Sequence, residues 1–538
     1  MRGRKRGRTD SISSESDEQL AHLAAEELAP LPDWYDEPDS GPPVTSLPGE
    51  QKSRYECSLD GVSAIGLPRP GSKEEEDRLV QSFLSGLQRL LSQEDNWTFW
   101  QQLMLSLDSC VRCQTCNDAC PIYLASGKQE VYRPTYRSEV LRRIISKYLR
   151  RGGRAFAKLT GTDIELNWPL IARLAESAYR CTMCRRCAQW CPLGSDNGLI
   201  THELRKLFSQ EMGIAPRELH EQGTVQQLRV GASTGTNPKA FKSIVSFMED
   251  EIEEKTGRKT KIPVDKEGAD ILLIHNSGEF LSWLENPEAF VILFEKAGLD
   301  WTLSSELCGY EATNYGLWYD DLQLARIVMR QTEVARQLGV RRIVIGECGH
   351  AHKALTVIAD RILTEQTYVH RESSIPLLED LVCSGKLELD PARNDFPVTL
   401  HDPCNMVRLM GIVEPQRRIL GRICPQFREM APHGVDNYCC GGGSGFAIMN
   451  SQNFPDWKVS VSGRMKFKQI LETFQDVISP DIRKYVCAPC SNCKGQLRDL
   501  FSHHDAWGRC GIFYGGLAEL IVNAMVDIKG PFLTWEWH

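Results

Sequence analysis

The chain has 538 residues, of which 41% are hydrophobic and 25% charged, and its formal net charge is −8 at pH 7. These proportions are those of an ordinary soluble globular protein and exclude a disordered or membrane-embedded one, while the acidic charge argues against a nucleic-acid binder. The length favours about three domains.

The sequence contains neither a predicted membrane-spanning helix nor a secretory signal peptide. No run approaches the roughly 20 apolar residues of a membrane helix, and the Arg-rich N-terminus lacks the apolar segment of a secretory signal. We therefore expect a cytoplasmic protein. Its 20 cysteines favour metal ligation, because disulfide scaffolds are typically short secreted domains.

Residues 1–65 have the composition of a flexible N-terminal tail. They open with basic residues, turn acidic and carry several prolines with little apolar periodicity. Residues 31–35 (Leu-Pro-Asp-Trp-Tyr) form an aromatic island within the tail. Such a segment can dock on a partner or pack on its own chain, and the sequence leaves both open.

Residues 66–215 are predicted to form an all-helical domain. Apolar residues recur with helical spacing over residues 74–107, and further helices are expected over 138–150, 169–180 and 199–212. Residues 133–158 contain nine Lys or Arg residues and one acid, Glu139. This basic stretch could meet an acidic partner or an anionic membrane surface, or it could be a solvated helix face.

The helical domain carries two motifs with the spacing Cys-x2-Cys-x2-Cys-x3-Cys-Pro, which is that of bacterial ferredoxins. The first contains Cys110, Cys113, Cys116 and Cys120, and the second contains Cys181, Cys184, Cys187 and Cys191. In such motifs three thiolates hold one cluster and the fourth reaches the partner cluster. We therefore expect two 4Fe-4S clusters, one on Cys110, Cys113, Cys116 and Cys191, and the other on Cys181, Cys184, Cys187 and Cys120. The alternatives are zinc, which prefers paired CxxC spacing, and buried free thiols.

Residues 216–268 are predicted to be a linker with one amphipathic helix. Short β-rich runs then alternate with helical ones, which predicts parallel α/β structure. Strands are expected at 271–274, 342–345, 398–400 and 484–486, and helices at 288–296, 322–338, 415–423 and 462–474.

The α/β region has the pattern of an internal repeat, with lobes at 269–390 and 391–538. In each lobe a strand ends on a polar turn beginning with histidine (His275; His401), and a later strand runs into a cysteine (Cys348; Cys490). The second lobe carries five cysteines at predicted strand ends, where parallel sheets bind ligands: Cys404, Cys439, Cys440, Cys490 and Cys493. A metal cluster is favoured over a structural turn with buried thiols, because adjacent cysteines rarely point the same way without a metal. Cys487 is close enough to compete as a ligand, although a buried thiol is the simpler interpretation.

Three segments of the second lobe carry a family resemblance: 401–404 (His-Asp-Pro-Cys), 438–443 and 487–495. They resemble the cysteine-rich CCG domain of heterodisulfide reductases and glycolate oxidase iron-sulfur subunits. Residues 346–353 and the fused two-cluster domain are most similar to the DsrK-like, HdrD-like subunits of DsrMKJOP complexes. The resemblance covers about residues 70–525. It implies an α+β multidomain protein, with the ferredoxin-type helical domain followed by a two-lobed α/β CCG domain.

The resemblance also implies a function. A third, catalytic 4Fe-4S centre, for which a noncubane form is open, would lie on the five cysteines of the second lobe. It would exchange electrons between a quinone and cytochrome b partner (DsrM-like) and the disulfide or trisulfide of a DsrC-like thiol protein in dissimilatory sulfur metabolism. The protein would be bound peripherally to the inner face of the cytoplasmic membrane. The competing hypothesis is a non-catalytic relay subunit beside a flavin-linked glycolate or glycerol-phosphate type dehydrogenase.

Heterodisulfide reductases with the full pattern carry the cysteine motif in both copies of the repeat, and the first lobe of this chain departs from that pattern. Ser277, Leu307 and Ala351 stand where the second lobe has Cys404, Cys439 and Cys493. A second catalytic cluster is therefore not expected. If the repeat is a real pseudo-twofold, Cys308, Cys348 and His350 should face the cluster of the second lobe, where they could bind substrate sulfur, ligate the cluster, shuttle protons or be remnant core residues.

Overall fold

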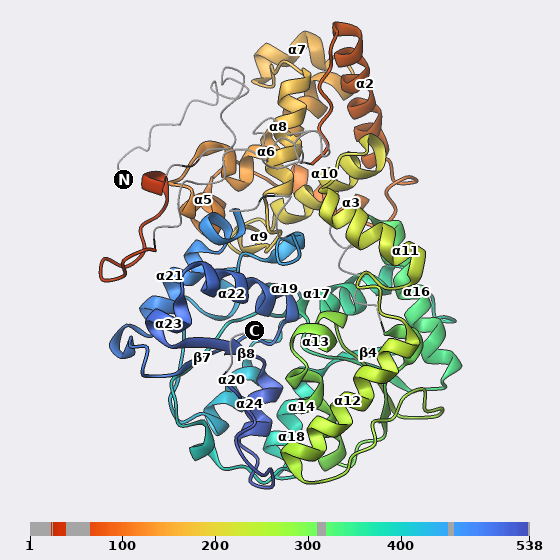
Figure 1. Ribbon diagram of the computed structural model, residues 1–538. Coiled ribbons are helices and arrows are strands. Elements are labelled where there is room, and N and C mark those ends of the chain that lie inside the picture. The colour runs from red at the N-terminus through yellow and green to blue at the C-terminus, as the bar shows by residue number, and fades with distance from the viewer. Residues whose placement is uncertain are drawn as a thin grey trace.

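The structure is a computed structural model that describes residues 23, 25–38, 65–308, 319–449, 454 and 457–535. Most of residues 1–65, for which the sequence predicts a flexible tail, lie outside the described residues. The chain forms a helical domain that sits on two α/β lobes (Figure 1). The expected combination of helical and parallel-sheet domains is confirmed.

Residues 65–230 contain only helices. The main ones are α2 (Lys73–Leu90), α3 (Trp100–Asp108), α4 (Thr115–Ala119), α5 (Pro121–Ala125), α6 (Pro134–Ile144), α7 (Gly153–Thr160), α8 (Trp168–Tyr179), α9 (Arg186–Gln189), α10 (Asn197–Met212) and α11 (Gln226–Val230). Helix α10 begins where the Asp196 side chain accepts hydrogen bonds from two backbone N–H groups, and it ends at Gly213, whose φ of 66° suits a residue without a Cβ. The α10 helix packs on α2, α3, α6 and α8 and so forms the centre of this domain. Helix α12 (Pro238–Thr256) then leads to the lobes and buries an apolar stripe, as expected of the linker helix.

Each lobe contains a four-stranded parallel sheet, ordered β2-β1-β3-β4 in the first and β6-β5-β7-β8 in the second. The strands are β1 (Ile271–Ile274), β2 (Trp301–Thr302), β3 (Arg342–Ile345), β4 (His370–Ser373), β5 (Val398–Leu400), β6 (Phe427–Arg428), β7 (Lys484–Cys487) and β8 (Ile512–Gly515). The two orders are the same when the strands are numbered within each lobe. The internal repeat predicted from the sequence is therefore confirmed as a repeat of topology.

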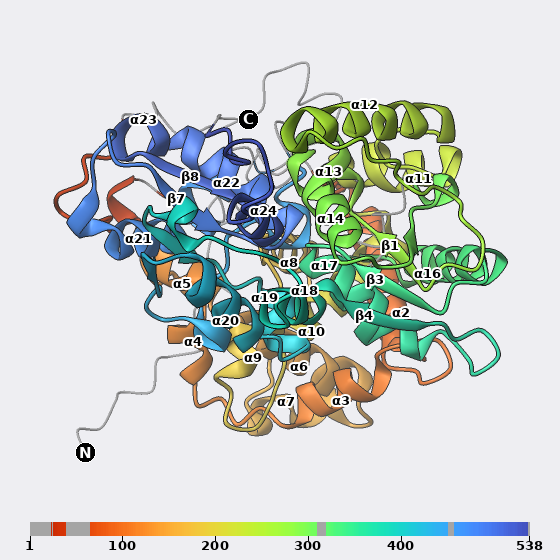
Figure 2. The ribbon, with the colours of Figure 1, turned by 90° about the horizontal axis from the view of Figure 1, so that it is seen from below.

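The lobes pack through equivalent helices, so that a pseudo-twofold axis relates them. Helices of the first lobe are α13 (Ser277–Ser282), α14 (Glu285–Lys296), α16 (Asp321–Gln337), α17 (Gly349–His352) and α18 (Ser374–Cys383). Those of the second are α19 (Cys404–Leu409), α20 (Glu414–Ile423), α21 (Arg464–Thr473), α22 (Ser491–His503), α23 (Ala506–Cys510) and α24 (Leu517–Asn523). Helix α14 packs on α24, and α18 packs on α20, between the lobes (Figure 2). These two contacts are equivalent within the repeat.

Residues 25–38 pack against the body of the protein instead of forming part of a flexible tail. The Ala29 amide donates to the Ala125 carbonyl at 2.9 Å, and the Tyr35 hydroxyl donates to the His504 carbonyl at 2.8 Å. The Arg464 guanidinium binds both carboxylate oxygens of Glu37. The aromatic island therefore packs on its own chain, and it connects the helical domain to the second lobe.

A buried cluster of charges fixes the lobes against each other. Lys494 of α22 lies 2.6 Å from a carboxylate oxygen of Glu279 in α13, and both side chains are buried. Glu347, which follows β3, accepts hydrogen bonds from the first two amides of α24. Burial raises the pKa of Glu279 to about 8 and that of Glu347 to about 7. Burial alone would lower the pKa of Lys494, but the neighbouring carboxylates outweigh it and raise that pKa, so Lys494 carries the positive charge.

Lys494→Met should destabilise the protein by about 3–5 kcal/mol, because it leaves carboxylates buried without their cation. Urea unfolding followed by circular dichroism measures the change. Lys73→Met is the matched control, because Lys73 pairs with Asp77 on the surface and its side chain is 69% exposed. The control should leave the unfolding midpoint unchanged. Equal midpoints for both variants would show that the interlobe ion pair does not stabilise the lobes.

Candidate functional site: three groups of cysteines

The first group of cysteines lies at the surface of the helical domain. Cys110, Cys113, Cys116 and Cys191 line one small cavity together. Cys113 is exposed, and Arg112 and Gln114 beside it have left-handed backbone conformations that turn this loop. The fourth cysteine of the second motif thus lies with the first three of the first motif, which is the arrangement that a ferredoxin-type pair of clusters requires.

The second group lies deeper. Burial raises the pKa of both Cys120 and Cys187, and each of these thiols is close enough to Cys181 and Cys184 for their charges to contribute. Cys184 is buried. The structure therefore brings together Cys181, Cys184, Cys187 and Cys120, the other crossed set of the sequence analysis.

The third group is a chain of contacting thiols where the strands of the second lobe end. Cys439 contacts Cys404 and Cys440, while Cys493 contacts Cys440 and Cys490. All five side chains are at most 9% exposed. The contacts from Cys439 and Cys493 hold the pKa of Cys440 well below its usual value, with help from His401. The pKa of Cys490 is also held well below its usual value, whereas the pKa of Cys439 and that of Cys493 are raised well above it. Cys440 and Cys490 are therefore the thiols of this group that favour the deprotonated, metal-binding form.

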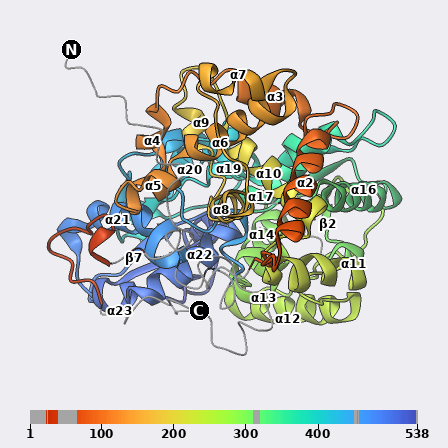
Figure 3. The ribbon, with the colours of Figure 1, turned by 90° about the horizontal axis from the view of Figure 1, so that it is seen from above.

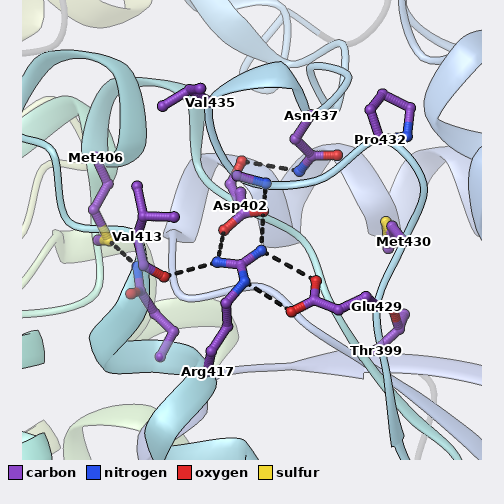
Figure 4. A network of polar contacts seen from close by, with 12 residues as sticks. Thr399, Asp402, Met406, Val413, Arg417, Glu429, Met430, Pro432, Val435 and Asn437 are labelled. Carbon is purple, nitrogen blue, oxygen red and sulfur yellow. Dashed lines mark hydrogen bonds and ion pairs between the residues drawn. The ribbon is translucent and has the colours of Figure 1, made fainter.

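The turn that carries Cys404 is held by a charged network (Figure 4). Arg417 of α20 donates to both carboxylate oxygens of Asp402, at 2.9 and 2.7 Å, and also pairs with Glu429. Asp402 in turn accepts the Gly434 amide, and its carbonyl accepts the Asn437 side chain. A bidentate arginine fixes geometry as well as charge, so this network positions the start of α19 and with it Cys404.

His401 is a residue of the site that the sequence analysis treated only as part of a motif. Its Nε2 lies 3.3 Å from Cys493 Sγ. One ligand atom each of His401, Cys440 and Cys493 lie within 4.8 Å of one another, as a shared metal centre requires. Its position directly after β5 is the signal that could have identified it, because the ends of parallel strands carry ligands.

The second and third groups are in contact across the domain boundary. Cys184 and Cys439 contact each other, and Arg408 of α19 donates to the Cys184 carbonyl at 2.8 Å. Arg186 of the helical domain donates to the Asp436 carbonyl at 2.7 Å. Although the two groups belong to different predicted domains, the structure places the second ferredoxin-type group directly against the third group.

The glycines of the Cys-Cys-Gly motif make this approach possible. A Cβ on Gly443 would lie 2.4 Å from the Thr182 carbonyl, between Cys181 and Met183. Gly441 has a φ of 98° and passes close to the Gly463 amide, so it could not carry a side chain either. Gly443 is thus a close-packed joint between the third group and the helical domain, whereas Gly441 packs closely within the second lobe.

The remaining cysteines of the lobes are placed differently from one another. Cys348 contacts Cys490 at the third group, whereas Cys308 is buried with its Sγ 3.8 Å from the Thr236 carbonyl. Cys487 is fully buried among apolar residues packed on the other face of the sheet, such as Leu400 and Ile521. The structure thus brings Cys348 to the site and buries Cys487 in the core.

A cavity of about 240 Å³ lies where the helical domain meets both lobes. Three cationic side chains line it: Arg185, Lys353 and Arg361. Lys353 lies near enough to Cys404 to feel its charge, and burial lowers the pKa of Lys353 to about 8. The acid Asp196 also lines the cavity and pairs with Arg185, so the cavity beside the third group has more basic than acidic side chains.

Two segments of the chain match known domain families. Residues 106–195 match a 4Fe-4S dicluster domain, and residues 398–498 match a cysteine-rich domain. The segments contain the eight ferredoxin-type cysteines and the five cysteines of the third group, respectively. These are the two kinds of domain that the resemblance to heterodisulfide reductases implies.

Its relatives agree with this resemblance, which is thereby confirmed. The chain is 28% identical over 470 residues to an Hdr-like menaquinol oxidoreductase iron-sulfur subunit 2 of Archaeoglobus fulgidus, covering 78% of this chain and 80% of that protein. It is 26% identical over 403 residues to a subunit of the dihydromethanophenazine:CoB–CoM heterodisulfide reductase of Methanosarcina acetivorans, covering 74% and 89%. It is also 23% identical over 457 residues to an EtfAB:quinone oxidoreductase of Syntrophomonas wolfei, covering 79% and 59%. These similarities support an iron-sulfur oxidoreductase.

None of the helices in the described part of the chain has the length and the apolar composition that crossing a membrane requires.

Gly443→Ala should separate the second and third groups, because the new methyl group clashes with backbone at Thr182. We expect overpacking to cost about 1–3 kcal/mol and electron transfer to the third group to slow. Freeze-quenched EPR of the loaded protein measures the rate. Gly421→Ala is the control, since nothing lies within 4 Å of a Cβ at Gly421. Unchanged kinetics in Gly443→Ala would refute a functional role for the close contact.

Proposed function

We propose that this chain is the catalytic iron-sulfur subunit of a membrane-associated complex. It would transfer electrons between a quinone-linked cytochrome b partner (DsrM-like) and the disulfide or trisulfide of a small thiol protein (DsrC-like), on the cytoplasmic side. The relatives that act as subunits of menaquinol oxidoreductases and heterodisulfide reductases support the quinone side and the sulfur side, respectively. The observation that carries the proposal is the contact between Cys184 and Cys439.

The three groups of cysteines form an ordered path from surface to interior. Cys113 of the first group is exposed, Cys184 of the second is buried, and Cys439 of the third is only 1% exposed. Electron exchange with a partner needs an accessible first site, and chemistry on a sulfur substrate needs a shielded last one. The gradient of exposure therefore fits electron exchange at Cys113 and catalysis at the third group.

The residues present fit three clusters. We assign one 4Fe-4S cluster to Cys110, Cys113, Cys116 and Cys191, a second to Cys181, Cys184, Cys187 and Cys120, and a third to Cys404, Cys439, Cys440, Cys490 and Cys493. The cavity that the first four cysteines share supports the first assignment. The close ligand atoms of His401, Cys440 and Cys493 support the third. Such clusters supply one-electron transfer at thiolate-bound iron. Reducing a disulfide then takes two electrons and two protons and gives two thiols.

Part of the basic stretch of residues 133–158 suits docking on a partner. Arg137, Arg142 and Arg143 are not available for it, because they bind Thr201, the Leu107 carbonyl and Glu139 within the domain. The exposed part is the neighbourhood of α7, where Phe156 and Leu159 are 59% and 85% exposed among basic residues: Arg150, Arg151, Arg154 and Lys158. Helix α7 lies at the end of the helical domain that faces away from the lobes (Figures 1 and 3). An apolar and basic surface there supports binding to a membrane partner without obstructing the third group.

A relay beside a flavoprotein is the second candidate. The similarity to an EtfAB:quinone oxidoreductase favours it. In that case the third group would pass electrons between partners and would not act on sulfur. The two functions differ in whether the purified chain, given electrons, reduces a disulfide without a flavoprotein.

The anaerobically purified protein should contain about twelve irons, because the thirteen assigned cysteines form three separate groups and each would hold four irons. Iron quantitation together with quantitative EPR measures the content. Saturation near eight irons would eliminate the third cluster and the catalytic function with it.

Cys440→Ser should abolish disulfide reduction while leaving assembly with the membrane partner intact. An oxygen ligand binds iron less well at this position, and α7 and the outer surfaces remain unchanged. The measurement is reduction of a protein disulfide by the purified complex with a viologen dye as donor. Cys487→Ser is the matched control, because Cys487 is a buried cysteine three residues from Cys490 but on the other face of the sheet. Wild-type turnover by a fully loaded Cys440→Ser protein would favour the relay.

A further inference from the structure

The first lobe contributes a thiol to the third group. Cys348 follows β3 as Cys490 follows β7, so the two cysteines occupy equivalent places in the repeat. They are 2% and 1% exposed, and their thiols contact each other across the pseudo-twofold axis. The contact between them places Cys348 beside a proposed iron ligand.

The sulfur of Cys348 and that of Cys490 are each contacted by residues of the opposite lobe. Gly349, the residue after Cys348, donates its amide to Cys490 Sγ at 3.3 Å, and the side chain of His350 also contacts that sulfur. In return, Ser491 and Asn492, the two residues after Cys490, contact Cys348, with Asn492 Nδ2 at 3.7 Å from its Sγ. Each sulfur is thus contacted by the turn of the opposite lobe.

Several N–H groups lie within hydrogen-bond distance of the sulfur of Cys348. Its Sγ also lies 3.4 Å from the Ala351 amide and 3.6 Å from Asn276 Nδ2, so N–H groups of both lobes are directed at it. Hydrogen bonds from N–H groups to ligand sulfur are one of the means by which proteins set the properties of iron-sulfur clusters. Cys424, a buried thiol away from the site, differs in that it lies among apolar residues of the lobe interface and has a side-chain contact with Asn394.

We propose that Cys348 is an iron ligand of the third cluster, so that the ligand set comes from both lobes. This inference rests on the proposed third cluster and adds a thiolate to its ligands. It gives the first lobe a direct part in the metal site although that lobe lacks three of the five cysteines of its counterpart. Cys308, the other cysteine that the first lobe retains in the repeat, lies beside Thr236 and serves as the matched control.

The test compares Cys348→Ser and Cys308→Ser in the full chain, purified anaerobically with its partners. Iron content, EPR and ⁵⁷Fe Mössbauer spectra are recorded for each. Cys348→Ser should lose iron from the third cluster or change the isomer shift of one of its irons, while the signals of the other two clusters stay as in the wild type. Cys308→Ser should match the wild type throughout. Wild-type Mössbauer parameters and iron content in Cys348→Ser would overturn the inference, even if a reduction potential shifts.

A second measurement covers the case in which Cys348→Ser fails to fold, which the loss of all cluster signals would reveal. Alkylation of wild-type thiols is followed by mass spectrometry before and after iron removal by a chelator. Iron removal should accelerate labelling of Cys348 together with Cys490, and an unchanged rate at Cys348 would overturn the inference. A wild-type content near eight irons, in contrast, would reject the proposed third cluster before any variant is compared.

Discussion

The buried ion pair between Lys494 and Glu279 is the interaction on which the geometry of the third group depends. It joins α22 to α13 across the two lobes, and Glu347 extends it to the start of α24. Lys494 lies one residue beyond Cys493, and Glu347 lies one residue before Cys348. The same buried charges that hold the lobes together therefore set the positions of sulfurs on both sides. Burying one cation among carboxylates costs desolvation energy, and in return it allows only one alignment of the lobes.

Much of the fold could be predicted from the sequence because the apolar patterns are strong. Strands β1, β3 and β5 match their predicted ranges. Helix α16 is shifted by one residue at both ends from its predicted range, and α20 begins one residue earlier than predicted. Strands β2 and β6 were not predicted, because two residues each carry too little pattern to be distinguished from a loop. Strands β4 and β8 were also missed. The β4 sequence, His-Arg-Glu-Ser, is polar, and its place in the sheet depends on tertiary contacts such as the one between Arg342 and Glu372.

Like the fold, the candidate site could be predicted from the sequence only in part. Spacing alone suggested the crossed groups in the helical domain, because a ferredoxin motif is a local pattern with a known geometry. Spacing could not show that Cys184 contacts Cys439, since 255 residues separate them and their contact depends on how two domains pack. Nor could it show that Arg137 and Arg143, counted in a basic stretch, are internal. Their charges are compensated by groups such as Glu139 and backbone carbonyls that only the fold brings near.

The packing of residues 25–38 has a consequence for biosynthesis. The Tyr35 hydroxyl bonds to a carbonyl 469 residues further along the chain, and Glu37 pairs with an arginine 427 residues away. A ribosome makes this segment before the second lobe, so its binding surface there exists only after Arg464 and His504 have emerged. The segment therefore attaches late, after the helical domain has been synthesised and could have received its metal. Its docking would then require both partners to be folded, because the segment bridges Ala125 of the helical domain and Arg464 of the second lobe.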